Sequence, residues 1–195
     1  MGARFERRNL ILSAVYWWSS IESELIYVGD SGAVEPSDPG RRRGYEITGF
    51  YRPNRWLAVD AVWTGSRSRY FGLPSGQDHV PGALNSAGEL GLSVILPGFA
   101  AAARLRYLGP HPLTEDNSVR GDDTFLVNLR ASWTPGHRPG WELYAELLNA
   151  LGSDDHDIDY FYRTRLPGEP SEGVEGRNSR IVEPRQVRIG IRKSF

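Results

Sequence analysis

The side chains that could do chemistry gather in the polar stretches of the chain, and few of them have the spacing that a reaction needs. Asp154, Asp155, His156, Asp157 and Asp159 form the one acidic cluster that could hold a hard cation through carboxylate oxygens. The cluster lacks the glycine and the terminal glutamate of an EF-hand loop, so the interpretation we favour is a solvated loop. The four histidines have no ligand spacing; they are His79, His111, His137 and His156.

Motifs and composition exclude several other classes of function. The sequence contains no Walker loop and no GxGxxG, HExxH or GxSxG motif. It has no cysteine, which excludes disulfides, thiol catalysis and cysteine-based zinc sites. The net charge of -1 gives no basic field for nucleic acid. We therefore predict a protein that is not an enzyme, holds no cofactor or metal, and does not bind nucleic acid.

Aromatic and charged side chains in the loops are the remaining candidates for recognition, because loops carry most binding residues. The same residues could equally serve the packing of the loops, and the sequence leaves both interpretations open. The candidate ligand contacts are Tyr70, Phe71, His79, Asp116, Tyr160 and Tyr162.

The elements that must position these residues are strands with one apolar and one polar face. In the closing stretch, Val187, Ile189 and Ile191 alternate with Arg188 and Arg192. Nine such stretches are predicted, with Ser19-Ser20 as a tight turn and a possible hairpin extension at 157–165. Their ranges are 10–18, 22–29, 43–52, 56–66, 87–96, 99–109, 123–134, 141–150 and 185–195.

Two patterns favour a transmembrane barrel over a soluble one. The connections alternate between short turns and long loops. The apolar faces also end in aromatic residues, as at a membrane interface. The alternative is a soluble lipocalin-like barrel with an apolar interior. The aromatic residues are Tyr16, Trp18, Tyr51, Trp63, Tyr107, Trp133, Trp141 and Phe195.

Charges on the polar faces are predicted to pair across neighbouring strands in a wet lumen. We expect Glu89 near Arg104 or Arg106, and Arg130 near Glu142 or Glu146. The two glutamates are expected near Arg188 as well. A solvated sheet face would predict the same pairs.

The number of strands predicts that residues 1–195 are the C-terminal part of a larger barrel. An odd count needs a parallel seam to close, whereas bacterial single-chain barrels have even counts. A further strand at 157–165 would remove this argument. Arg4, Arg7 and Arg8 before an apolar run resemble a short signal peptide, but the alternation in that run favours a first strand. With no export signal, we expect a missing N-terminus.

Several motifs then resemble a known family of outer-membrane proteins. Residues 147–151, LLNAL, resemble the Asn-Leu-Phe-Asp step before the last loop of TonB-dependent outer-membrane receptors, with Ala150-Leu151 departing from that pattern. Residues 157–162 (DIDYFY), 165–170 (RLPGEP) and 183–185 (EPR) are similar to the C-terminus of one bacterial branch of that family.

This resemblance implies an antiparallel transmembrane β-barrel in the cell outer membrane. The family has a 22-stranded barrel with an N-terminal plug, and it imports ferric siderophores, cobalamin or oligosaccharides. The resemblance implies periplasmic short turns, extracellular long loops, and a terminal Phe195 recognised by the barrel-assembly machinery. This chain has no plug and no TonB box, so TonB would engage only the missing N-terminal part. A small self-contained barrel, acting as a pore or in adhesion, is the alternative.

The resemblance and the charges together imply contacts with the membrane. Outer-membrane lipid and lipopolysaccharide are the expected surroundings of such a barrel. Residues 41–43 are three consecutive arginines at a predicted loop-to-strand junction, where they could contact lipopolysaccharide phosphates. The alternative for this run is a solvated rim.

Overall fold

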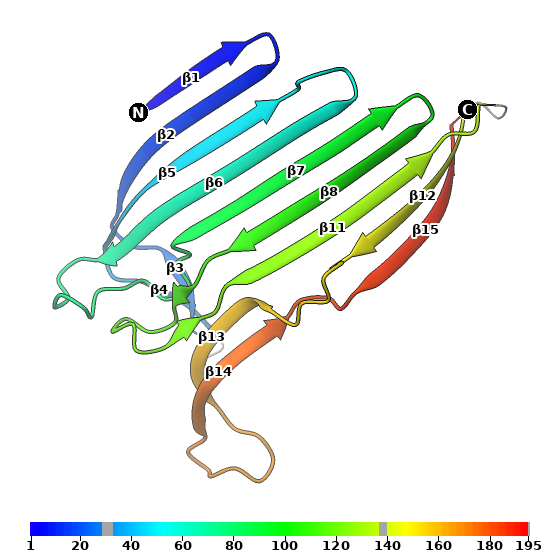
Figure 1. Ribbon diagram of the computed structural model, residues 1–195. Coiled ribbons are helices and arrows are strands. Elements are labelled where there is room, and N and C mark those ends of the chain that lie inside the picture. Colours follow the sequence, from blue (N-terminus) through cyan, green and yellow to red (C-terminus); the bar gives the residue numbers. More distant parts are fainter. Residues whose placement is uncertain (29–32, 137–139, 195) are drawn as a thin grey trace.

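The computed structural model describes residues 1–28, 33–136 and 140–194, and its main element is one antiparallel sheet. Within those ranges the sheet has nine strands, ordered β1-β2-β5-β6-β7-β8-β11-β12-β15 (Figure 1). No helix in this part of the chain is long and apolar enough to cross a membrane. The strands are β1 (Gly2–Arg7), β2 (Leu10–Ile21), β5 (Gly40–Tyr51), β6 (Leu57–Tyr70), β7 (Ser86–Leu96), β8 (Phe99–Leu108), β11 (Thr124–Trp133), β12 (Trp141–Leu148) and β15 (Gln186–Lys193).

The connections on one side of the sheet are short, and those on the other side are long. Residues 8–9, 52–56, 97–98 and 134–140 make the short connections. Residues 22–39, 71–85, 109–123 and 149–185 make the long ones, which contain three small hairpins (Figure 1). These hairpins pair β3 (Leu25–Val28) with β4 (Ala33–Pro36), β9 (His111–Pro112) with β10 (Arg120–Gly121), and β13 (His156–Thr164) with β14 (Val174–Ile181).

The register keeps apolar side chains on one face across the whole sheet. One row of paired positions runs through Ala14, Ile47, Trp63, Gly88, Tyr107 and Phe125. This apolar face is exposed, with Leu92 at 44% and Ile47 at 50% of full exposure. Such a surface is far more apolar than a soluble protein tolerates, and it suits a sheet whose solvent on that side is lipid.

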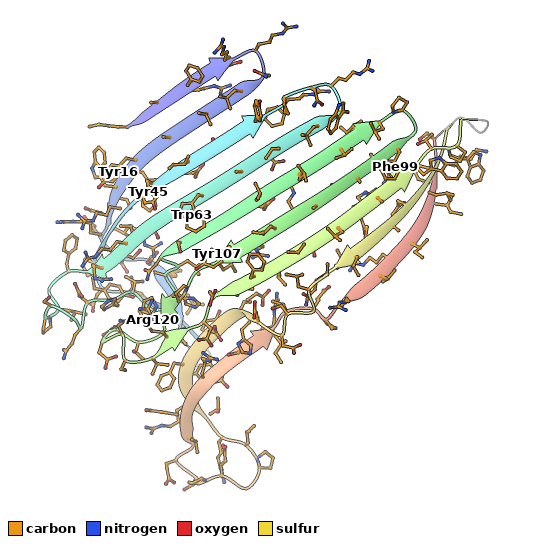
Figure 2. The ribbon with its side chains drawn as sticks, viewed as in Figure 1. Tyr16, Tyr45, Trp63, Phe99, Tyr107 and Arg120 are labelled. Atoms are coloured by element: carbon orange, nitrogen blue, oxygen red, sulfur yellow. The ribbon has the colours of Figure 1, made fainter. Side chains whose placement is uncertain are left out.

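Aromatic rings border the apolar face at both ends of the strands. Near the long loops, Tyr16, Tyr45, Trp63 and Tyr107 follow one another across the sheet, while Phe99 lies near the opposite end (Figure 2). Phe99 and Tyr107 lie eight positions apart in β8. This separation is roughly 27 Å along a strand, and roughly 20 Å along the membrane normal at a tilt of about 40°.

Two glycines leave room for the aromatic rings near the long loops. A Cβ atom on Gly65 would lie 2.6 Å from the ring of Tyr45, and one on Gly88 would lie 2.5 Å from the ring of Trp63. Trp63 then stacks on Tyr107, with ring centroids 5.6 Å apart and planes 10° apart. Glycine at these positions therefore lets each ring lie flat across the neighbouring strand.

The opposite face carries the charges and confirms two of the predicted cross-strand pairs. Arg104 binds Glu89 and Asp60, each at 2.7 Å. Asp60 reaches Arg104 across β7, because Gly91 stands between them and has no side chain. Arg130 binds Glu146 at 2.5 Å.

The predicted pairing around Arg188 is only partly found. Arg188 stands opposite Glu146 in the register, but its ion pair is with Glu183 at 3.8 Å. Glu142 instead pairs with Arg192 at 3.2 Å.

Two predictions near the N-terminus are wrong. Residues 22–29 do not form a strand of the main sheet, because Leu25–Val28 pairs only with Ala33–Pro36 in a loop hairpin. Ser19-Ser20 is not a turn; both residues lie inside β2, paired with Arg42 and Arg41. The strand missing from the predicted set is β1, whose arginines hide the alternation of Ala3 and Phe5.

The hairpin predicted at 157–165 is confirmed as β13, which pairs with β14 outside the main sheet. The count of nine main-sheet strands among the described residues therefore stands. Phe195, the predicted assembly signal, lies outside the described residues.

Candidate ligand-binding pocket at the long-loop end

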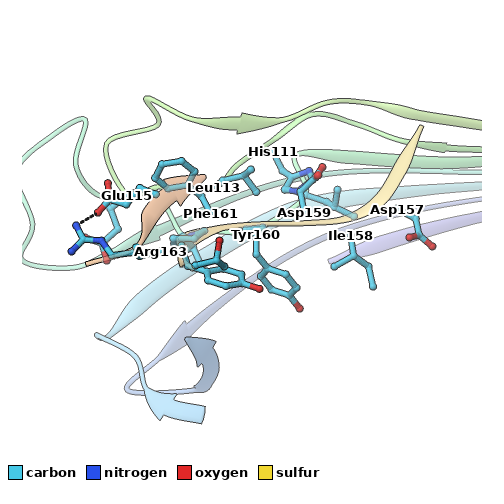
Figure 3. Close-up of a pocket in the computed structure, with 18 of the residues that line it drawn as sticks. His111, Leu113, Glu115, Asp157, Ile158, Asp159, Tyr160, Phe161 and Arg163 are labelled. Carbon is cyan, nitrogen blue, oxygen red and sulfur yellow. Dashed lines mark hydrogen bonds and ion pairs between the residues drawn. The ribbon is translucent and has the colours of Figure 1, made fainter. Parts of the chain in front are cut away.

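A large cavity opens where the long loops meet. Its volume is about 1180 Å³. One wall is β13, from Asp157 to Thr164, and the facing walls come from residues 80–84, from β9 and from Glu24 and Arg42 (Figure 3). The cavity is larger than the usual range of roughly 300–1,000 Å³ for small-molecule sites, so it suits a bulky ligand.

The wall formed by β13 is held in place by a buried asparagine at the end of β12. Asn149 is 3% exposed and has a φ of 46°. Its side-chain amide donates to the carbonyl oxygens of Ser153 at 2.7 Å and Glu183 at 3.0 Å, and its Oδ1 accepts from the Ser153 amide at 2.9 Å. These bonds tie together the two ends of the longest loop.

The start of β13 is also bound to β11. The Thr124 hydroxyl donates to the carbonyl oxygen of His156, and the Phe125 amide donates to the carboxylate of Asp155 at 2.7 Å. The β13–β14 hairpin is therefore fixed to the sheet at its base.

The two faces of β13 have different environments. Asp159 and Phe161 point toward His111 and Leu113, while Ile158 and Tyr160 point to the other side (Figure 3). Asp159 is 4% exposed; it accepts from the Ser179 hydroxyl and lies 3.8 Å from Arg177. Tyr160 is 42% exposed, and its ring meets that of Tyr162 edge-on at 6.5 Å.

The charges around the pocket are mostly paired with one another. Arg42 pairs with Glu24, and Arg163 with Glu175 at 2.9 Å. Asp157 accepts two hydrogen bonds from Arg180, at 2.9 and 2.5 Å. The hydrogen bonds from Arg180 lower the pKa of Asp157 below its usual value.

The acidic cluster at 154–159 is spread over separate partners. Asp155 faces the Phe125 amide, Asp157 faces Arg180, and Asp159 faces Ser179 and Arg177. Among the described residues, no group of three or more His, Cys, Asp or Glu side chains is arranged to hold a metal ion.

The structure brings together only two of the six candidate ligand contacts. Tyr160 and Tyr162 line the pocket. Tyr70 is 6% exposed and borders a small neighbouring cavity. Phe71 lies outside the pocket, under the guanidinium of Arg41 at 5.0 Å.

The other two candidates lie in loops beside the pocket. The Nδ1 of His79 is 3.1 Å from the carbonyl oxygen of Glu115. Asp116 closes a tight turn, in which it accepts from the amide and the hydroxyl of Ser118 at 3.1 and 2.8 Å. Hydrogen bonds from Thr114 and Ser118 lower the pKa of Asp116 to about 2.

Sequence reasoning missed the charged pocket residues Glu24, Arg42, Arg163 and Glu175. A usable signal existed for Arg42, because it alternates with Arg41 and Arg43 in a strand and must face the other way. No such signal existed for Glu24, which reaches the pocket only through the loop hairpin of β3 and β4.

No family model matches this sequence, and no curated protein matches it. Solved structures do match. The ferric yersiniabactin uptake receptor FyuA from Yersinia pestis aligns with a TM-score of 0.73 at 16% identity, covering 100% of this chain and 29% of the receptor.

Two other receptors give the same result. The ferric-catecholate import receptor Fiu from E. coli K12 has a TM-score of 0.67 at 17% identity, with 96% of this chain and 26% of the receptor covered. The FrpB iron transporter from Neisseria meningitidis has a TM-score of 0.65 at 17% identity, with 100% and 30% covered. This chain therefore spans less than a third of the length of each receptor.

These alignments confirm the predicted fold, a set of antiparallel strands like those of outer-membrane β-barrels. The strands pair antiparallel in an order that follows the chain, and the long loops gather at one end (Figure 1). The chain has the fold of the barrel strands of TonB-dependent outer-membrane receptors.

Proposed function

We propose that residues 1–195 are the C-terminal part of the barrel of an outer-membrane receptor that takes up a scarce ligand by energy-coupled transport. The observation that carries this proposal is the pocket of about 1180 Å³ at the long-loop end, on the side of the sheet that bears the charges. The ligand classes are those inferred from the sequence: a ferric siderophore, cobalamin or an oligosaccharide.

The lining of the pocket supports a ligand with flat or ring-shaped faces. Tyr160 and Tyr162 offer aromatic surface, and Ile158 extends it. Arg42 and Arg163 stand at the walls, already paired with Glu24 and Glu175. A ligand that carries both rings or sugars and polar groups would use both kinds of contact.

The edges of the sheet support a larger barrel. The edge strands β1 and β15 are the first and ninth strands of an antiparallel series, so they run in the same direction. Antiparallel closure therefore requires an odd number of additional strands. A second copy in the same membrane orientation would meet these edges parallel, so we assign the additional strands to another part of the same receptor.

The partners follow from this assignment. Outer-membrane lipid and lipopolysaccharide would surround the apolar face. The barrel-assembly machinery would recognise the last strand and Phe195. TonB would engage the receptor outside residues 1–195.

The binding test uses the whole receptor that contains these residues, purified from outer membranes. Ferric siderophores, cobalamin and oligosaccharides are titrated while tryptophan fluorescence is recorded. We expect one class to bind, and Tyr160→Ala/Tyr162→Ala to weaken it roughly tenfold, about 1.4 kcal/mol. Tyr51→Ala on the apolar face is the control and should bind normally. If the Tyr160→Ala/Tyr162→Ala variant binds the ligand as tightly as the Tyr51→Ala control, the pocket is not the ligand-binding site.

A second measurement tests the assignment to a larger barrel. The 195-residue chain alone is refolded in lipid bilayers, and its conductance is recorded. We expect no stable channels, because both sheet edges would lack partners in hydrocarbon. Uniform, long-lived channels would favour a small self-contained barrel acting as a pore.

A further inference from the structure

Four arginines lie on the apolar side of the sheet at the long-loop end of β5 and β6. The register places Arg41 directly opposite Arg69, and Arg43 directly opposite Arg67. We call these four residues the arginine quartet. Each pair sets like charges face to face across two strands, an arrangement that by itself destabilises a sheet.

The quartet faces the outside of the barrel and not its charged interior. Residues two apart in a strand share a face, so Arg43 and Arg41 continue the face of Tyr45. In the same way, Arg67 and Arg69 continue the face of Trp63. Arg43 also stands opposite Trp18 of β2. The quartet therefore lies just beyond the aromatic row, where the membrane interface would be.

The quartet has little countercharge. The Nε of Arg69 lies 3.4 Å from the Oδ1 of Asp78, an ion pair without hydrogen-bond geometry. Asp78 is shared with His79 at 3.9 Å. In the part of the chain that the structure describes, Arg43 and Arg67 are exposed and have no ion-pair partner.

An arginine on the opposite face of the same strand does have an acidic partner. Arg42, between two members of the quartet, points to the charged face and pairs with Glu24. Arg41 is held from one side by the ring of Phe71, with its guanidinium 5.0 Å from the ring centre. Among the described residues, Arg69 therefore has Asp78 as its ion-pair partner, whereas the other three members of the quartet have none.

We propose that the arginine quartet binds phosphate groups of lipopolysaccharide in the outer leaflet. Paired positions in a sheet lie about 5 Å apart, and positions two apart in a strand lie about 7 Å apart. Guanidinium groups bind phosphate through two parallel hydrogen bonds, and four of them on such a patch match a multiply phosphorylated headgroup. The acyl chains would then lie along the apolar face below the aromatic row.

This proposal rests on the outward orientation of the long loops in the proposed function, but not on the pocket or its ligand. The test uses the whole receptor, purified in detergent and delipidated, and follows its thermal unfolding as lipopolysaccharide is added. We expect lipopolysaccharide to raise Tm, and Arg43→Gln/Arg67→Gln to need at least tenfold more lipid for half of the effect.

Two matched variants separate the quartet from charge in general. Arg7→Gln/Arg8→Gln removes two exposed arginines at the opposite, short-turn end of the sheet and should respond like the wild type. Arg43→Lys/Arg67→Lys keeps the charge without the planar fork and should fall between the two. Without lipid, Arg43→Gln/Arg67→Gln should unfold at the same or higher temperature, since it relieves an opposed pair of like charges.

The choice of lipid decides the source of the phosphate. Lipopolysaccharide stripped of its phosphates should have no effect that depends on the quartet. An equal effect of that lipid, of phosphatidylglycerol or of inorganic phosphate would overturn the proposal, as would an equal response of the quartet variant and the Arg7/Arg8 control. Tyr160→Ala/Tyr162→Ala should keep the full rise in Tm with lipopolysaccharide. A result that rejects the ligand pocket would therefore not reject the lipopolysaccharide site at the quartet.

Discussion

The loop end of this protein buries hydrophobic side chains within the protein, whereas the sheet leaves its apolar side chains exposed. The hydrophobic residues that the protein itself buries are Tyr70, Val80, Leu113 and Val182, all at the loop end, among the residues that the structure describes. The sheet has no such core; its apolar side chains stay exposed, and Ile189 on the edge strand is 80% exposed. The loop end thus has a small hydrophobic core, as a soluble protein does. The apolar face of the sheet has no such cover from the protein and is suited to contact with lipid.

This difference explains why the two regions use polar groups differently. At the loop end, Asn149 and Asp159 are buried, and both form side-chain hydrogen bonds. On the sheet, Arg104, Asp60 and Glu89 remain 34–48% exposed while paired. Buried polar groups fix a single loop arrangement, but half-exposed pairs contribute little to stability and leave a wet wall.

The largest effect that we predict contrasts the two faces of one strand. Leu92→Arg places a charge in the middle of the apolar face, and we expect it to destabilise the protein by about 2–4 kcal/mol in lipid. Ser93→Arg, one residue further on the charged face, should cost less than about 1 kcal/mol. Denaturant unfolding of the whole receptor in lipid vesicles measures both. Equal costs would show that the two faces share one solvent.

The next effect should be confined to the loop end. Asn149→Ala removes a buried amide that holds both ends of the longest loop, and we expect a local loss of about 1–3 kcal/mol. Hydrogen exchange should quicken in residues 150–184 while β7 and β8 keep their protection. Asn178→Ala is the control, because its amide bonds only the nearby Gly176 carbonyl, at 3.1 Å. Faster exchange throughout the sheet would mean that the two regions unfold together.

We predict a smaller effect for the ion pairs on the charged face of the sheet. Asp60→Asn/Glu89→Gln removes both partners of Arg104, and we expect a loss of about 0.2–1 kcal/mol for each pair, declining as salt is added. The measurement is denaturant unfolding at low and high ionic strength. Arg4→Gln, whose partner Glu6 is close by on the exposed edge strand, is the control. A loss of stability that does not change with salt concentration would indicate that water does not reach the charged face of the sheet.

The alternation of side chains was sufficient to predict most of the sheet, because period two is fixed by strand geometry. It failed at β1, where the charged residues Arg4, Glu6 and Arg7 around Phe5 mask the pattern, and at 22–29, where an alternating stretch pairs locally. Tyr160 and Tyr162 were selected as aromatic residues in a predicted loop, and the structure places both in the lining of the pocket. Sequence reasoning could not find Glu24 or Glu175, because their approach to the pocket depends on loop hairpins whose register no periodicity encodes.

The smallest effect concerns one exposed turn at the loop end. The pKa of Asp116 is lowered to about 2 from 3.8 by hydrogen bonds from Thr114 and Ser118. Because the folded pKa is depressed, the turn gains its stability from the ionised carboxylate above pH 3.8, and loses it as pH falls toward 2. Carboxyl chemical shifts should therefore titrate near pH 2, and near pH 3.8 in Thr114→Ala/Ser118→Ala.

A control residue separates this local effect from the charge of the whole protein. Asp157 lies in β13, where hydrogen bonds from Arg180 lower its pKa, and this lowered pKa should not change in the Thr114→Ala/Ser118→Ala variant. If Asp116 titrates at the same pH with and without its two partners, the loop end does not hold this carboxylate. The Asp116 carboxylate would then be as weakly bound as the half-exposed charges of the sheet. The loop end would differ from the sheet only in its buried residues.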